Sequence, residues 1–108
     1  MSRVYQVNQD VVANPTTVVI GRGFEVVEVH LEYFTDTNYD TAETPGAGTA
    51  VVTGKRQDDK VVTLSSLDCT DVETFVATVG DLKEVTVTPT GITVAGAYRV
   101  VVTVTDAG

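Results

Sequence analysis

The 108-residue sequence is short of several residue types, and each shortage excludes a class of protein. Leucine occurs four times, methionine once and tryptophan never, whereas a helical bundle or coiled coil needs leucine and other strong helix formers at helical spacing. Cys69 is the single cysteine, so the chain forms no intrachain disulfide. The apolar runs are all short, so we expect no membrane-spanning segment.

Basic side chains are also scarce, with 7 Lys and Arg against 15 Asp and Glu and a net charge of -8. Nucleic acids and anionic membranes bind clusters of Lys and Arg, so we expect neither as a partner. The negative charge is uneven, because residues 23–54 contain no Lys or Arg. The carboxylates of that segment are Glu25, Glu28, Glu32, Asp36, Asp40 and Glu43.

Valine and threonine are abundant, with 23 and 18 residues. Both are β-branched, and such residues are favoured on pleated sheets. The apolar content of 43% is enough to build a core, and the length suits one domain over residues 1–108. The start, Met1-Ser2-Arg3, leads directly into a strand pattern, so we expect no secretory signal peptide and synthesis in the cytoplasm.

Alternating polarity predicts strands at 3–7, 16–20, 24–34, 50–53, 60–67, 84–88, 92–94 and 98–105. In the longest of them, Val27, Val29, Leu31 and Tyr33 form an apolar face, and Glu28, His30 and Glu32 form a polar one. Charged residues 54–59 and Pro89-Thr90-Gly91 predict turns. Eight or nine short strands without intervening helices predict an antiparallel β-sandwich of immunoglobulin-like or jelly-roll type.

Two segments allow more than one interpretation. Residues 70–73 fit a helix capping box, but the β-branched residues that follow favour a strand over 73–79. In the long acidic loop at 35–48, Asp36 to Asp40 match the D-x-N-x-D opening of an EF-hand. Thr41 and Ala47 then replace the glycine and glutamate that an EF-hand requires, so we expect no metal there, with a looser calcium site as the alternative.

No group of residues in the sequence forms an enzyme signature. His30 is the only histidine, so a structural zinc site lacks ligands. No G-x-S-x-G occurs, and Ser65-Ser66 lies within a strand pattern. The glycine pairs match no phosphate-binding loop. We therefore expect no catalysis, no cofactor and a role in binding or assembly, in which oligomerisation would also cover the apolar strand edges.

Residues 63–76 (TLSSLDCTDVETFV) and the closing strand at 97–103 (AYRVVVT) resemble a pattern in small β-sandwich proteins of tailed-phage particles, over about residues 60–105. Cys69 stands where that pattern usually has glycine. The resemblance implies a virion structural protein, either a capsid decoration (cement) protein or a neck or tail component. It would be made in the host cytoplasm and not secreted. Its partners would be the major capsid protein or other virion proteins, together with further copies of itself in a dimer or trimer.

Related patterns occur in carbohydrate-binding sandwiches, which is the alternative function. Tyr39, flanked by Asp36, Asn38 and Asp40, is the candidate sugar platform. For a partner protein, we predict contacts in the 35–48 loop and the N-terminal strand, since long loops and termini are the parts most free to dock. The predicted contact residues are Tyr39, Asp36, Asp40, Glu43, Arg3 and Tyr5.

Overall fold

The computed structural model describes residues 2–68, 74–92 and 95–106. Its strands are β1 (Ser2–Gln9), β2 (Thr16–Val19), β3 (Phe24–Phe34), β4 (Thr49–Arg56), β5 (Val61–Asp68), β6 (Thr74–Val79), β7 (Leu82–Thr90) and β8 (Ala97–Asp106). Within the described ranges there is no helix that could cross a membrane. The predicted all-β class is confirmed.

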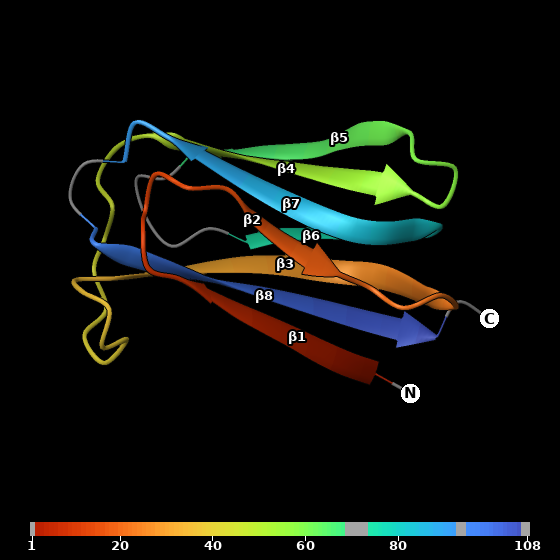
Figure 1. Cartoon of the computed structure of the whole chain (residues 1–108), viewed down its shortest axis with the longest axis horizontal. Coiled ribbons are helices and arrows are strands. Elements are labelled where there is room, and N and C mark those ends of the chain that lie inside the picture. Colours follow the sequence, from red (N-terminus) through yellow and green to blue (C-terminus); the bar gives the residue numbers. More distant parts are fainter. Residues whose placement is uncertain (1, 69–73, 93–94, 107–108) are drawn as a thin grey trace.

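Two antiparallel four-stranded sheets pack face to face (Figure 1). One has the strand order β1-β8-β3-β6 and the other β2-β7-β4-β5. The first strand pairs with the last, the second with the seventh, the third with the sixth and the fourth with the fifth. The chain is therefore one long hairpin folded over into a sandwich, which is the jelly-roll arrangement and not the immunoglobulin-like one.

Valine fills the space between the sheets. The fully buried side chains include Leu31, Val52, Val87, Val100, Val102 and Val104. Burying one such side chain contributes about 1.5–3 kcal/mol, so this layer is the main source of stability. Tyr98 closes one end of the core: its hydroxyl accepts a hydrogen bond from Thr16 Oγ1 at 2.7 Å and donates one to the Asn14 carbonyl at 2.5 Å.

Threonine covers the outer face of the second sheet. Thr17, Thr86, Thr53 and Thr63 lie in register on four successive strands. The hydroxyls of Thr17 and Thr86 are 2.9 Å apart and hydrogen-bonded. The core is therefore rich in valine, and the outer face of this sheet is rich in threonine.

β3 has its predicted bounds, but its inward face differs from the prediction. A β-bulge lies between Val26 and Glu28 in the pairing with both neighbouring strands. The extra residue reverses the alternation, so Val26 is buried and Val27 is partly exposed. The prediction that Val27 shares the inward face with Val29 was therefore wrong, because strict alternation assumes unbroken pairing.

The turn predicted at 54–59 begins later, because β4 continues through Gly54 to Arg56. Gly54 faces the core, where an added Cβ would lie 2.8 Å from a methyl group of Leu82. Glycine at this position leaves space for the Leu82 side chain. The charged residues that follow, Lys55 and Arg56, are the last two residues of β4. Composition alone suggested a turn because glycine and charge usually mark one.

The strand predicted at 84–88 is longer at both ends, and Pro89 lies inside β7 opposite Ala50. The neighbouring β2 pairs with β7 only as far as Val87. Beyond Val87 this edge of β7 has no partner among the described strands, and proline is tolerated at such positions because no ladder donor is required there.

The interpretation of residues 73–79 as a strand is confirmed for Thr74–Val79, which form β6. The capping-box residues 70–73 lie outside the described residues. The short strand predicted at 92–94 lies mostly outside them too, and Ile92 is in no strand.

Candidate interaction surfaces

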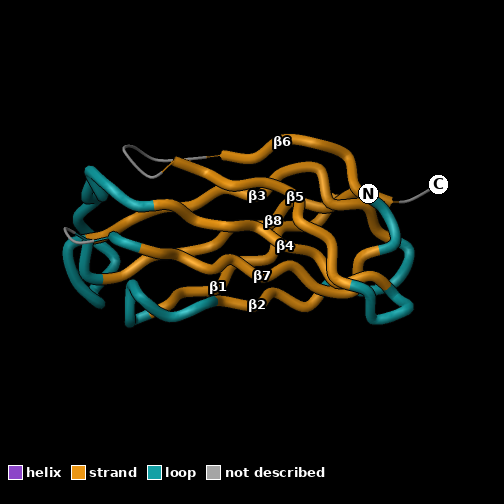
Figure 2. Tube along the Cα trace, turned by 90° about the horizontal axis from the view of Figure 1, so that it is seen from above, coloured by secondary structure: helices purple, strands orange, loops and turns teal. Residues whose placement is uncertain are grey.

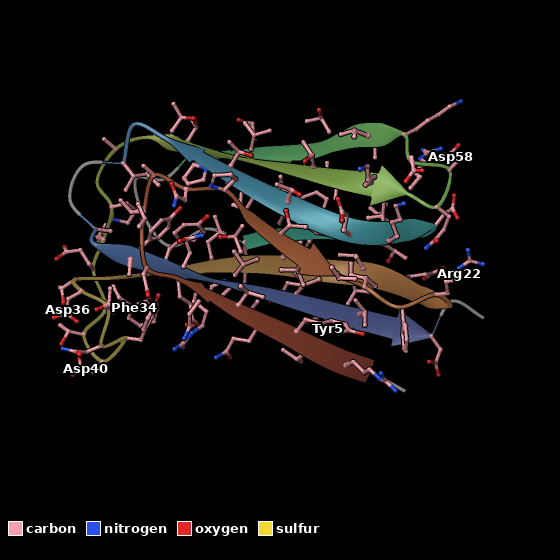
Figure 3. All side chains as sticks on the ribbon, viewed as in Figure 1. Tyr5, Arg22, Phe34, Asp36, Asp40 and Asp58 are labelled. Atoms are coloured by element: carbon pink, nitrogen blue, oxygen red, sulfur yellow. The ribbon has the colours of Figure 1, made fainter. Side chains whose placement is uncertain are left out.

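The loop between β3 and β4 projects from one end of the sandwich, where Figure 3 labels Asp36. Its first half continues β3 as a narrow hairpin, because Phe34 forms an isolated bridge with Ala42. The Asp36 carboxylate accepts the backbone N–H of Asn38 at 2.9 Å. That contact is typical of an Asx turn, so one carboxylate of the loop has a structural role.

Tyr39, at the tip of this loop, is held by contacts within the chain. Its ring packs edge-on against Phe34 with the ring centroids 5.3 Å apart. Its hydroxyl donates a hydrogen bond to Asp10 Oδ1 at 2.7 Å. Desolvation, reinforced by this hydrogen bond to a carboxylate, raises the pKa of Tyr39 to about 12. The hydroxyl therefore stays protonated and keeps the loop tied to the end of β1.

Arg99 on β8 joins the same cluster. Its guanidinium lies 4.9 Å from the ring centroid of Phe34 and 5.6 Å from that of Tyr39. It donates to Glu32 Oε2 at 3.2 Å and to Asn8 Oδ1 at 2.8 Å. Through these two contacts Arg99 links β1, β8 and β3 beneath the loop.

The side chains of the other two loop carboxylates, Asp40 and Glu43, make fewer contacts that hold the loop. Asp40 Oδ1 accepts the Thr41 hydroxyl at 3.3 Å, and Glu43 is tied to Tyr33 through its backbone N–H at 2.9 Å. In the part of the chain that the structure describes, no three His, Cys, Asp or Glu side chains are close enough to hold a metal ion.

Arg3 and Tyr5 do not join this cluster. They lie toward the opposite end of β1, where the Arg3 guanidinium is 5.1 Å from the ring centroid of Phe24. Seven residues of extended strand separate Arg3 from Asp10, a distance of about 23 Å. Figure 3 shows Asp36 at the loop end of the molecule and Tyr5 away from it, along β1. The six predicted contact residues therefore form two separate surfaces, and binding by either one stays a prediction.

His30 lies on the outer face of the first sheet, as the alternation predicted. Its Nδ1 is 2.5 Å from the Thr74 hydroxyl on β6, and its Nε2 is 3.7 Å from Glu32 Oε1. The histidine thus helps hold the edge strand β6 on β3.

A further candidate surface runs along the four edge strands, one of which is the N-terminal strand predicted to make contacts. Figure 2 shows β1 and β2 along one long side and β5 and β6 along the other. Each carries one exposed valine: Val4 at 62%, Val19 at 69%, Val61 at 64% and Val76 at 71%. Strand composition could have suggested this surface, but only after the topology had shown which strands are edges.

Charge is lowest on these same strands. β2 and β6 contain no charged residue, β1 contains only Arg3, and β5 contains only Asp68. The four inner strands contain two or three charged residues each. This distribution is the reverse of the usual one, in which charges on the edge prevent strands from pairing with other chains.

An open hollow of about 310 Å³ lies at the end of the sandwich away from the acidic loop. It is lined by Arg22, Gly23, Phe24, Gln57, Asp81 and Leu82. The lining combines two apolar side chains with charges of both signs, so it favours no one class of ligand.

No protein-family model and no curated protein matches the sequence. By fold, the chain is similar to a chain of the Bacillus endospore appendages, which form a family of disulfide-linked pili. The TM-score is 0.54 at 10% identity, over 96% of this chain and 84% of that chain. This likeness shows a shared fold and nothing more.

Two further structures are less similar. One is the Drosophila NLP core, whose structure provides insight into pentamer formation and histone binding, with a TM-score of 0.49, 13% identity and coverage of 98% and 99%. The other is the VP2 subviral particle of infectious bursal disease virus, with a TM-score of 0.42 and 11% identity over 99% of this chain and 33% of that chain. Both are too distant to support an argument about this chain.

Proposed function

We propose that this protein is a non-enzymatic structural subunit that binds neighbouring subunits in a larger assembly. The observation that carries the proposal is the composition of the sheet edges. Edge strands of proteins that stay monomeric are usually blunted by Lys, Pro, bulges or short length. Here the edges carry almost no charge, each presents an exposed valine, and β1 is neither short nor interrupted by a bulge. Edges of this kind suit a chain that meets other chains along its long sides.

Within that class we propose a virion component, either a capsid decoration protein or a neck or tail component. Support comes from the resemblance of residues 60–105 to small sandwich proteins of tailed phages and from the jelly-roll topology, which is common in viral capsid domains. The fold is also shared with a pilus protein, a component of another large assembly. The chain would be made in the host cytoplasm and would bind the major capsid protein, or neck or tail proteins.

A decoration protein stabilises a particle by mass action, because it binds the assembled lattice and not the free subunits. The acidic 35–48 loop and the sheet edges would then be the contact regions. The alternative of a sugar-binding module is less well supported. The ring of Tyr39 is engaged by Phe34 and Arg99 and its hydroxyl by Asp10, so the platform proposed for a sugar is not free.

The test is co-sedimentation of the full chain with intact particles, and separately with dissociated capsid subunits, from the virus that encodes it. The proposal expects binding to particles and none to free subunits. A gene next to a major capsid or portal gene would agree with it. A chain that sediments with neither preparation, and whose gene lies outside any viral locus, would contradict the virion proposal.

A further inference from the structure

Of the four edge strands, β1 is the one best suited to receive another strand. It pairs with β8 over eight consecutive residues without a register shift. β2 has only four residues, and the pairing of β5 with β4 is interrupted by a bulge. β6 has a register shift in its pairing with β3. In the described part of the chain β1 has no strand partner other than β8, so its second edge offers a row of free N–H and C=O groups.

The core is also less completely covered at β1 than at β8. On the inner face, Tyr5 lies opposite Val102 and Val7 lies opposite Val100. Both valines are 0% exposed, whereas Tyr5 and Val7 pack on the core and remain partly exposed. The strand that faces this side from the other sheet is the short β2, which leaves part of the inner face of β1 uncovered.

We propose that β1 pairs antiparallel with β1 of a second copy, joining two four-stranded sheets into one continuous eight-stranded sheet. This inference rests on the proposed function and names its first partner. Residues opposite each other in an antiparallel pair share a face. A two-fold axis at Tyr5 meets that condition, with Val4 opposite Gln6, Arg3 opposite Val7 and the two Tyr5 rings together on the inner face. Such a pair closes on itself and forms a dimer.

The charges on β1 permit pairing with a second copy, and the position of the acidic loop favours the antiparallel direction. Arg3 is the only charged residue of β1, and in the proposed register the two Arg3 side chains lie about 13 Å apart. The acidic 35–48 loop lies at the Asp10 end of the strand. Antiparallel pairing places the two acidic loops at opposite ends of the dimer, whereas parallel pairing would bring them side by side. For a chain with a net charge of -8 this difference decides the direction.

The first experiment is sedimentation velocity of the full chain over a range of concentrations. The test variant, Val4→Lys with Gln6→Lys, places lysines opposite one another twice across the proposed pair. The matched control, Val61→Lys with Thr63→Lys, makes the same charge change at exposed positions of β5. Like charges directly opposite each other weaken a strand pair, so we expect the test variant to raise the dimer Kd about tenfold or more. The control should leave the Kd unchanged.

The second experiment tests the register. In a Cys69→Ser background, Tyr5→Cys places two thiols across the two-fold axis, and mild oxidation should give a covalent dimer. Val61→Cys is the control that should stay monomeric under the same conditions. A cross-linked Tyr5→Cys dimer that resists dilution supports the proposal.

A wild-type chain that is monomeric at every concentration overturns the β1 pair. So does a dimer that the β5 control dissociates and the β1 variant does not. Neither result touches the proposed function, because binding to particles is measured separately and can occur through another edge.

Discussion

β1 and β8 are paired over eight residues, yet they differ in almost every physical respect. The inward side chains of β8 are all 0% exposed, and β8 has a strand on each side. β1 has a strand on one side, an inner face that is only partly covered and an outward valine that is 62% exposed. Inner strands such as β8 stabilise the sandwich through their buried side chains. Edge strands such as β1 contribute less to the core and keep one side available for pairing with another chain.

The largest expected effect is at the centre of β8. Val102→Ala should lower the free energy of unfolding by about 2–3 kcal/mol, because two buried methyl groups are lost and a cavity remains. Val4→Ala on β1 should change it by less than about 0.5 kcal/mol, since an exposed side chain gains little from folding. Urea denaturation of both variants measures the difference. Equal losses would show that β1 is as much a part of the core as β8.

The next effect concerns the hydroxyl of Tyr98. Tyr98→Phe leaves Thr16 Oγ1 and the Asn14 carbonyl without this partner, which should cost about 1–3 kcal/mol. Tyr39→Phe removes one hydrogen bond at the surface and should cost less than about 1 kcal/mol. Urea denaturation again gives both values. Asp10 and Asn14 both lie in the connection between β1 and β2. A larger loss of stability for Tyr39→Phe than for Tyr98→Phe would mean that this connection is held mainly by the acidic loop and not by Tyr98.

A smaller effect should appear at alkaline pH. The pKa of Tyr39 is raised to about 12 from an ordinary value of 10.0. The folded chain therefore holds this proton when the unfolded chain releases it, so stability is full below about pH 10 and falls as the pH rises toward 12. The pKa of Tyr98 is also raised, by burial, and adds to the same trend.

Spectrophotometric titration of tyrosinate, in the wild type and in Tyr39→Phe, identifies the late-titrating group. Loss of the transition near pH 12 in the variant agrees with the assignment. A Tyr39 that titrates near its ordinary value would show that the hydroxyl is not held by Asp10, and that the loop is free to move away from β1.

The smallest effect concerns Asp36. Asp36→Ala removes the carboxylate that accepts the Asn38 N–H, and should lower stability by about 0.5–1 kcal/mol. Asp40→Ala, in the same loop, should change stability by less, because its carboxylate accepts a long hydrogen bond of 3.3 Å from the adjacent Thr41 hydroxyl. Thermal unfolding compares the two variants. If both behave alike, the turn is set by the backbone and not by Asp36.

Much of the fold could be predicted because the physics of a strand is local. The alternation in 24–34 gave β3 its correct bounds, and the strand predicted at 98–105 covers all but the two end residues of β8. The strand bounds and the inward face were mispredicted where a residue's conformation depends on a neighbour distant in the sequence. Gly54 leaves space for the Leu82 side chain. Pro89 lies in β7 beyond the last residue that pairs with β2. The bulge after Val26 depends on the pairing of β3 with both flanking strands.

The candidate surfaces were harder to predict for the same reason. Arg3 and Tyr39 belong to segments that look equally exposed in the sequence. In the structure they lie at opposite ends of β1, because Arg3 contacts Phe24 and Tyr39 contacts Asp10. The sequence analysis named the N-terminal strand as a contact element, but it could not identify β2, β5 and β6 as the other edges, because edges are defined by strand pairing. Only the pairing of the whole chain defines an edge.

We propose that copies of this chain and its partner proteins associate through the nearly uncharged edge strands. The most direct test is sedimentation velocity of a variant with one lysine on every edge, at positions Val4, Val19, Val61 and Val76. Its control has four lysines on the outer faces of the inner strands β4 and β8, at Thr49, Thr53, Val101 and Thr105, none of them opposite another, so the net charge is equal. We expect the wild type and the control to associate, and the edge variant to stay monomeric and folded. An edge variant that associates as strongly as the wild type would contradict it.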